Sequence, residues 1–307
     1  MTDYDIIIAG AGPAGLTAAI YARRAGKSVL VLEKAAFGGQ ITHSPKVENY
    51  PGFPVISGNE LAEKLLDQAI ALGAEVDVDA VTDVVDLGEW KSVITERKEY
   101  ITHAVIIASG SKHRTLGLPN EEELTGNGVS YCVLCDGAFF AGREVAVIGG
   151  GNSALQEAVL LSETCSKVTV IQNLGFLTGE ESLIKNLQAR QNVYFIFNTI
   201  VTGLQGKEEL TGLKLKNTED NTESDFAVDG IFVAIGQVPE NKPFAGVCEI
   251  DERGYIVANE TCCTKTPGIF VAGDCRTKGI RQITTATGDG ASAALAACKY
   301  IEDTRVL

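Results

Sequence analysis

Apolar and polar residues along the chain predict strands that alternate with helices. Residues 4–9 (YDIIIA) form a continuous apolar run typical of a buried parallel strand, and residues 16–25 are small and helix-compatible. A second apolar run covers residues 28–32. Capping-box spacing at residues 57–60 is followed by an apolar stripe from 61 to 72, which predicts an amphipathic helix. Strands and helices in this order are typical of an α/β fold with a parallel sheet.

The same pattern returns further along the chain. An alternating stretch over 76–103 predicts an antiparallel insert, and the other expected segments are strands at 104–108, 144–148, 167–171, 230–235 and 269–272 and a helix at 284–297. Gly149 lies 139 residues after Gly10, and Gln172 lies the same distance after Glu33. We therefore predict two Rossmann-like, three-layer ββα nucleotide-binding domains, with the second (116–242) inserted in the first (1–115 and 243–307).

The first strand runs directly into Gly10-Ala11-Gly12-Pro13-Ala14-Gly15, and the second strand ends in Glu33. Glycines at these positions let the backbone approach a pyrophosphate at a helix N-terminus, and the acid can accept from a ribose hydroxyl. With both strands and the helix in place, this motif predicts dinucleotide binding.

The second glycine motif, residues 149–154 (GGGNSA), is followed by a strand that ends in Gln172 in place of an acid. Residues 173–179 carry no charge before Glu180. One interpretation is an ordinary turn at a sheet end. We favour a second, in which this fold no longer holds a pyridine nucleotide, because a phosphate without cationic partners binds poorly.

A CxxC pair, Cys132 and Cys135, precedes Asp136. Two cysteines so spaced can cycle between dithiol and disulfide, and an adjacent acid can pass a proton to a departing thiolate. The spacing alone also fits half a zinc site or two core residues. No second CxxC and no neighbouring His pair accompany it, so we expect no metal.

Composition restricts the function classes. The 307 residues carry a net charge of −14, which argues against a general nucleic-acid binder, and no apolar run is long enough to span a membrane. The first residues have no basic region and no cleavage site of the secretory type. Eight cysteines without an export signal predict a cytoplasmic protein, where a disulfide is more often catalytic than structural.

The motifs GAGPAG, GGQ, VENYPG, CVLCDG, GGGNSA, GDC and RQ fall in the order seen in the low-molecular-weight thioredoxin reductase family, which the chain resembles over nearly its whole length. The resemblance implies an FAD-containing homodimer that reduces thioredoxin. Cys135 would face the flavin and form the transient bond to it, Cys132 would attack the thioredoxin disulfide, and Asp136 would serve as acid and base. The implied cofactor-binding residues are Gly10, Gly12, Pro13, Ala14, Gly15, Glu33, Lys34, Gly39, Gln40, Asn49, Ala108, Gly110, Gly273, Asp274, Arg281, Gln282 and Ile283.

Members of the family that use NADPH carry an HRRxxxR run where this chain has Gln172-Asn173-Leu174 and Thr178. The chain therefore looks more like the ferredoxin-dependent flavin thioredoxin reductases, with ferredoxin as electron donor. One alternative is an NADPH-dependent thioredoxin reductase or a related NAD(P)H disulfide reductase. Another is a redox-sensing flavoprotein with a non-catalytic dithiol. An acidic ferredoxin needs a basic docking patch, for which the candidates are Lys112, His113, Arg114, Arg276, Lys278 and Arg281. Domain rotation implied by the family would use hinges near residues 112–119 and 239–243.

Overall fold

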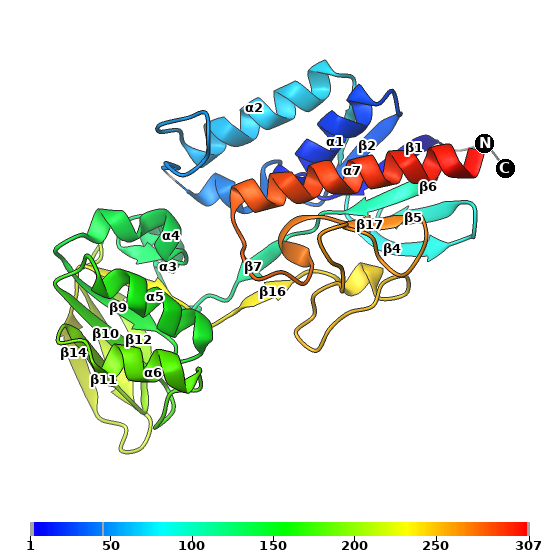
Figure 1. Ribbon diagram of the computed structural model, residues 1–307. Coiled ribbons are helices and arrows are strands. Elements are labelled where there is room, and N and C mark those ends of the chain that lie inside the picture. The colour runs from blue at the N-terminus through cyan, green and yellow to red at the C-terminus, as the bar shows by residue number, and fades with distance from the viewer. Residues whose placement is uncertain (1–2, 45, 306–307) are drawn as a thin grey trace. The chain divides into compact units, whose positions relative to one another are not determined.

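The computed structural model describes residues 3–44 and 46–305 and divides the chain into two compact units. Unit 1 contains Met1–Lys112 and Val238–Leu307, and unit 2 contains His113–Gln237 (Figure 1). The chain crosses between the units twice, and the two crossing segments pair as the short strands β7 (Ser111–His113) and β16 (Gln237–Pro239). The division falls three residues before the first expected domain boundary and five before the second.

Unit 1 is built on a seven-stranded sheet of order β3-β2-β1-β6-β5-β4, with β17 paired to β6. Its strands are β1 (Tyr4–Ala9), β2 (Val29–Glu33), β3 (Glu75–Val78), β4 (Val81–Asp86), β5 (Lys91–Thr95), β6 (Glu99–Ile107) and β17 (Ile269–Val271). The pairs β1–β2, β1–β6, β2–β3 and β6–β17 are parallel, whereas β4, β5 and β6 pair antiparallel.

Two expectations for this sheet need correction. The antiparallel insert was expected from residue 76, but β3 pairs parallel with β2 at the sheet edge. Its EVDV sequence alternates because an edge strand is partly solvated, so polarity alone does not give its direction. The expected break between 103 and 104 is also absent, because β6 is one strand that pairs with β5 at its start and with β1 further along.

Helices cover one face of the unit 1 sheet (Figure 1). They are α1 (Pro13–Arg24), α2 (Gly58–Ala71) and α7 (Ile283–Arg305). The Ser57 hydroxyl accepts from the Glu60 N–H at 3.2 Å, which confirms the predicted cap of α2. Helix α7 runs past the expected end at 297, because Cys298 and Ile301 continue its buried face. On the other face, Val84 of β4 and Val93 of β5 pack with Ile7 of β1 and with the segment around the 3-10 helix Lys242–Phe244.

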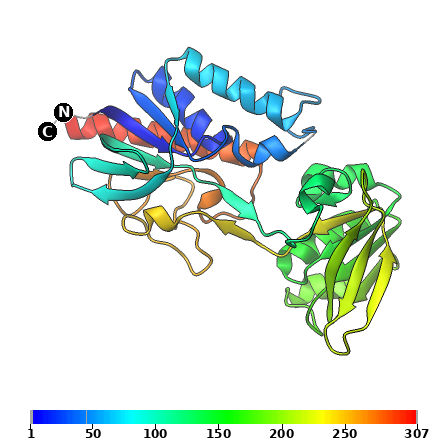
Figure 2. The ribbon, with the colours of Figure 1, turned by 180° about the vertical axis from the view of Figure 1, so that it is seen from behind.

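Unit 2 repeats this plan with a parallel sheet of order β11-β10-β9-β15-β8. Its strands are β8 (Val129–Ser130), β9 (Glu144–Ile148), β10 (Lys167–Ile171), β11 (Val193–Ile196) and β15 (Gly230–Val233). The helices α5 (Asn152–Ser162) and α6 (Glu181–Gln188) cover one face. The other face packs on a three-stranded antiparallel sheet, seen in yellow-green in Figure 2, of β12 (Thr199–Gln205), β13 (Gly212–Asn217) and β14 (Glu223–Ala227).

Both units are therefore three-layer ββα folds, and the predicted fold class is confirmed. Two short helices precede β9 in unit 2, α3 (Glu121–Leu124) and α4 (Val133–Asp136). Over residues 3–44 and 46–305, every helix is too short or too polar to cross a bilayer.

Candidate functional site

The CxxC pair forms a disulfide ring at the start of α4. Cys132 and Cys135 are bonded, with their Cα atoms 5.3 Å apart. Cys132 is the N-cap residue of α4, and its sulfur accepts a hydrogen bond from the Cys135 N–H at 3.2 Å. A sulfur held at a helix start by a backbone N–H is stabilised as a thiolate once the ring is reduced.

Asp136 reaches the same ring through Ser130. The Ser130 hydroxyl donates to Asp136 Oδ2 at 2.6 Å, and Ser130 Oγ accepts from the Cys132 N–H at 3.1 Å. Burial raises the pKa of Asp136, and the hydrogen bond from Ser130 opposes that rise. The carboxyl therefore keeps its proton to a higher pH than an exposed aspartate does. Sequence reasoning missed Ser130, for which the only signal was its place two residues before Cys132.

The ring lies beside exposed apolar side chains. Leu134, between the two cysteines, is 59% exposed, and Phe139 is 39% exposed. Cys132 and Cys135 are themselves half-buried. A partner disulfide that approaches this surface would meet apolar contact area next to the sulfurs.

In unit 1 the first glycine motif forms a tight turn between β1 and α1. Gly10 has φ +113°, and a Cβ there would lie 2.2 Å from the Ala108 carbonyl oxygen. A Cβ on Gly15 would lie 1.9 Å from the Gly10 oxygen, whereas one on Gly12 would lie 4.0 Å from the Gly38 oxygen. Gly12 is the N-cap of α1 and Pro13 opens the helix, which has no side-chain cap. The helix N-terminus is thus available to a phosphate.

Glu33 at the end of β2 faces this turn. Its Oε2 accepts from the Ala11 N–H at 2.8 Å and its Oε1 from the Ala35 N–H at 3.2 Å, which leaves acceptor capacity for a ribose hydroxyl. Lys34, predicted to touch the cofactor, directly follows β2 and is paired with Glu240, which also accepts from Lys112 at 3.3 Å. Its contact with the cofactor stays a prediction.

Distant predicted residues meet around the same edge of the sheet. A Cβ on Gly39 would lie 3.3 Å from the Gly12 Cα, so the loop that leads to the exposed Gln40 lies against the glycine turn. Asn49 Nδ2 donates to Gln282 Oε1 at 3.3 Å across 233 residues of sequence. Ala14 is the second residue of α1. The other predicted residues follow the ends of β6 and β17 or lie at the start of α7, and they are Ala108, Gly110, Gly273, Asp274, Arg281 and Ile283.

Asp274 is the most informative of them. Its Oδ1 is buried and has no hydrogen-bond partner among the residues that the structure describes. Burial raises the pKa of this carboxyl, against the charges of Lys278 and Arg281. A buried oxygen without a partner needs a donor. A ligand with hydroxyl groups, such as the ribityl chain of FAD, could supply that donor. The uncapped N-terminus of α1 could bind the pyrophosphate of the same ligand.

The second glycine turn, in unit 2, has different chemistry around it. Gln172 is buried, and its side-chain nitrogen would lie 2.5 Å from a Cβ on Gly150. Its amide bonds within its own loop, because Nε2 donates to the Phe176 carbonyl at 3.4 Å and Oε1 accepts from the Asn173 N–H at 3.2 Å. Glu180 accepts from Asn152 Nδ2 at 3.0 Å, which places a negative charge at the first residue of α5.

The predicted basic docking patch is not formed as expected. Arg276 is 1% exposed, and the Lys278 side chain is 5% exposed and ion-paired to Asp289 at 2.9 Å. Burial lowers the pKa of His113, so this imidazole is neutral at physiological pH. Arg281 lies over the Tyr255 ring, 4.2 Å from its centroid. The prediction that Arg276 and Lys278 dock a partner is wrong, because sequence shows a charge and not its buried partner.

Comparisons with known proteins agree with this geometry. Residues 4–290 match the family of pyridine nucleotide-disulphide oxidoreductases. The chain is 46% identical to a thioredoxin reductase of Listeria monocytogenes and 44% identical to one of Bacillus subtilis, each over 98% of this chain and 94% or 95% of the relative. The crystal structure of thioredoxin reductase from Streptococcus pyogenes matches with a TM-score of 0.94 at 40% identity over 98% of both chains.

These matches extend over both units of this chain, from the first glycine turn through the redox ring to Asp274. They show that the cofactor of this chain is FAD. Taken with the Cys132–Cys135 disulfide, they show that the chain belongs to the low-molecular-weight thioredoxin reductase family.

Proposed function

We propose that the chain reduces the disulfide of thioredoxin through Cys132 and Cys135, with FAD as the resident cofactor and reduced ferredoxin as the electron donor. The observation that carries the activity is the disulfide ring at the start of α4, next to a buried acid. The observation that carries the choice of donor is the uncharged loop after β10 in unit 2.

The ring supports a two-step exchange. In the reduced state the Cys132 thiolate attacks one sulfur of the substrate disulfide, which forms a mixed disulfide and releases one substrate thiolate. Cys135 then attacks the Cys132 sulfur, closes the ring and releases the second substrate thiolate. Two electrons leave the dithiol, and Asp136, whose pKa is raised by burial, is placed to donate a proton to a departing thiolate.

We assign FAD to unit 1. The uncapped N-terminus of α1 would take the pyrophosphate, Glu33 the ribose, and the unpaired oxygen of Asp274 a ribityl hydroxyl. Asn49, Gln282 and the loop at Gln40 would border the ring system, as the resemblance implies. When bound, FAD supplies the electrons that reopen the disulfide ring.

The donor follows from the electrostatics of unit 2. A 2′-phosphate or pyrophosphate needs cationic or N–H donors, and residues 172–179 offer no cation. The nearest acid, Glu180, sits at the start of α5 and would repel a phosphate there. Gln172, whose amide bonds to its own loop, has no carboxylate for a ribose diol. A protein donor needs none of these contacts. For its docking the exposed Lys112 and Arg114 remain candidates.

An anaerobic titration of the purified holoenzyme tests the donor. We expect NADPH and NADH to leave the oxidised flavin absorbance unchanged, and reduced ferredoxin or dithionite to bleach it fully. Rapid stoichiometric bleaching by NADPH would refute the ferredoxin donor and establish the second candidate, an NADPH-dependent thioredoxin reductase. That candidate is favoured by the match of residues 4–290 to the pyridine nucleotide-disulphide oxidoreductases.

The assembly and the location also follow from the family. We propose a cytoplasmic homodimer, and light scattering of the purified holoenzyme should give twice the 32.5 kDa mass of one chain. A mass of one chain would remove the dimer from the proposal without affecting the dithiol chemistry.

A further inference from the structure

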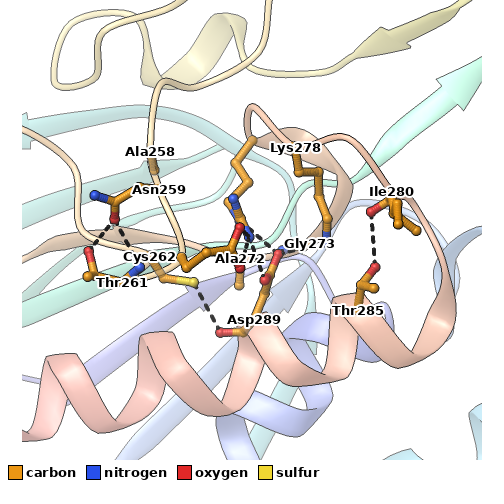
Figure 3. A network of polar contacts seen from close by, with 12 residues as sticks. Ala258, Asn259, Thr261, Cys262, Ala272, Gly273, Lys278, Ile280, Thr285 and Asp289 are labelled. Atoms are coloured by element: carbon orange, nitrogen blue, oxygen red, sulfur yellow. Dashed lines mark hydrogen bonds and ion pairs between the residues drawn. The ribbon is translucent and has the colours of Figure 1, made fainter.

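Asp289, on the second turn of α7, is the centre of a buried polar network in unit 1 (Figure 3). Its Oδ2 accepts from the Gly273 N–H at 3.0 Å, from Arg276 Nε at 2.9 Å and from Lys278 Nζ at 2.9 Å. Its Oδ1 accepts from Arg276 Nη2 at 2.8 Å. Its backbone carbonyl accepts from the Cys262 thiol at 3.5 Å. One carboxylate thus receives four hydrogen bonds from a single six-residue segment, 273–278.

The charges in this network are unequal. The side chains of Arg276 and Lys278 are both buried, and Glu260, which also pairs with Arg276, has a side chain that is 91% exposed. Burial by itself would raise the pKa of Asp289, but the hydrogen bonds from Arg276 and Lys278 outweigh it and lower the pKa. Asp289 is therefore charged, and it is the buried counter-ion of two buried cations.

The segment that Asp289 holds is the one that carries Asp274. On one side of Asp274, Gly273 has φ +81°, and a Cβ there would lie 2.9 Å from the Ala14 Cβ, so the turn is pressed against α1. On the other side, the Cys275 carbonyl accepts from Asn241 Nδ2 at 2.8 Å. The turn is therefore fixed from both sides, while Asp274 Oδ1 has no hydrogen-bond partner within residues 3–44 and 46–305.

We infer that Asp289 is a positioning residue for the flavin site, which holds the 273–278 turn on α7 so that the free oxygen of Asp274 faces a ribityl hydroxyl. The inference rests on the assignment of Asp274 to FAD in the proposed function. A carboxylate at this point serves two purposes, because it fixes the Gly273 N–H and compensates two cations. A role in charge compensation alone would tolerate a carboxylate displaced by one methylene, whereas a positioning role would not.

The test measures FAD release from dilute holoenzyme by the rise of free FAD fluorescence, together with the melting temperature of each FAD-free protein. Asp289→Glu keeps the charge and displaces it. We expect FAD to bind at least about tenfold more weakly, a difference of ~1.4 kcal/mol, while the FAD-free melting temperature changes little. Asp289→Asn removes the charge and should weaken both FAD binding and the fold.

Two further variants make the outcome specific. Glu302→Gln removes another ion pair of α7, to Lys27 at 3.1 Å, and should leave FAD binding unchanged. Asp274→Ala should weaken FAD binding, and in that background Asp289→Glu should add little, since the two residues act as one unit.

The possible failures are distinguishable. Unchanged FAD release in both Asp289 variants, with a loss in Asp274→Ala, would overturn the inference and leave the proposed function intact. Full additivity of Asp274→Ala and Asp289→Glu would also overturn it. Unchanged FAD release in Asp274→Ala would instead overturn the assignment of that residue.

Discussion

Glu157 on α5 gives the sharpest prediction for unit 2. Its Oε2 is buried and has no hydrogen-bond partner among the described residues. Ala154, Ala158 and Leu161 share its helix face, and all three are buried. Burial therefore raises the pKa of the Glu157 carboxyl to about 8. A group of this kind destabilises the fold whenever the pH favours its ionised form.

The magnitude follows from proton linkage. At a pH between the ordinary glutamate pKa of 4.5 and the folded-state pKa of about 8, the Glu157 carboxyl has lost its proton in the unfolded chain and still holds it in the folded chain. Unfolding then releases a proton, so stability falls as the pH rises through this window. From pH 6 to pH 8 the loss is about 2 kcal/mol, allowing for half-ionisation of the folded carboxyl at pH 8. The Glu157→Gln side chain has no proton to release. The amount by which its free energy of unfolding exceeds that of the unsubstituted protein should therefore be about 2 kcal/mol greater at pH 8 than at pH 6.

Urea unfolding of FAD-saturated protein, followed by far-UV circular dichroism, measures this difference. Trp90, the single tryptophan, lies in unit 1, so its fluorescence separates the unfolding of unit 1 from that of unit 2. Glu181→Gln is the control, because that side chain is 79% exposed on the neighbouring helix. An advantage of Glu157→Gln that is equal at pH 6 and pH 8 would contradict the reasoning.

Three further predictions concern the redox ring and the donor. Cys135→Ser should trap thioredoxin as a stable mixed disulfide on Cys132, seen by mass spectrometry; trapping on Cys135 in a Cys132→Ser variant instead would reverse the assigned roles. Asp136→Asn should slow thioredoxin reduction by about 10²-fold or more. It should also remove the loss of rate at high pH that deprotonation of Asp136 causes in the natural protein. An unaltered pH–rate profile would exclude Asp136 as the proton donor. Arginines at the exposed positions Asn173 and Leu174 should tighten NADPH binding by about tenfold or more, as measured by calorimetry. Unchanged affinity would show that added positive charge is not sufficient for this loop to bind NADPH.

Local signals in the sequence predicted much of the fold. Both glycine turns, their flanking strands and the cap of α2 have a local sequence signature, so composition and spacing were enough to place them. Strand β3 was assigned the wrong direction, because the pairing of Glu75 with Leu30 joins segments 45 residues apart and leaves no trace in the local pattern.

The site was predictable where a residue acts through its own position and not where it acts through a distant partner. Asp274 could be placed by the strand that precedes it. Arg276 and Lys278 were expected at the surface, because a charged side chain is usually exposed, but Asp289 from α7 pairs with both in the interior. Ser130 and Asp289 could not be found beforehand, because a lone serine or aspartate carries no motif.

The two glycine turns show why a dinucleotide motif reports the fold better than the ligand. The first glycine of each turn lies against the backbone at the end of a neighbouring strand: a Cβ would lie 2.2 Å from the Ala108 oxygen at Gly10 and 2.6 Å from the Ala234 oxygen at Gly149. That glycine is required by packing whether or not a nucleotide binds. The residue that differs is at the next strand end, where Glu33 accepts from the turn and Gln172 bonds to its own loop. An inserted unit can therefore keep its glycine turn for packing alone, so the turn does not report whether unit 2 holds a nucleotide.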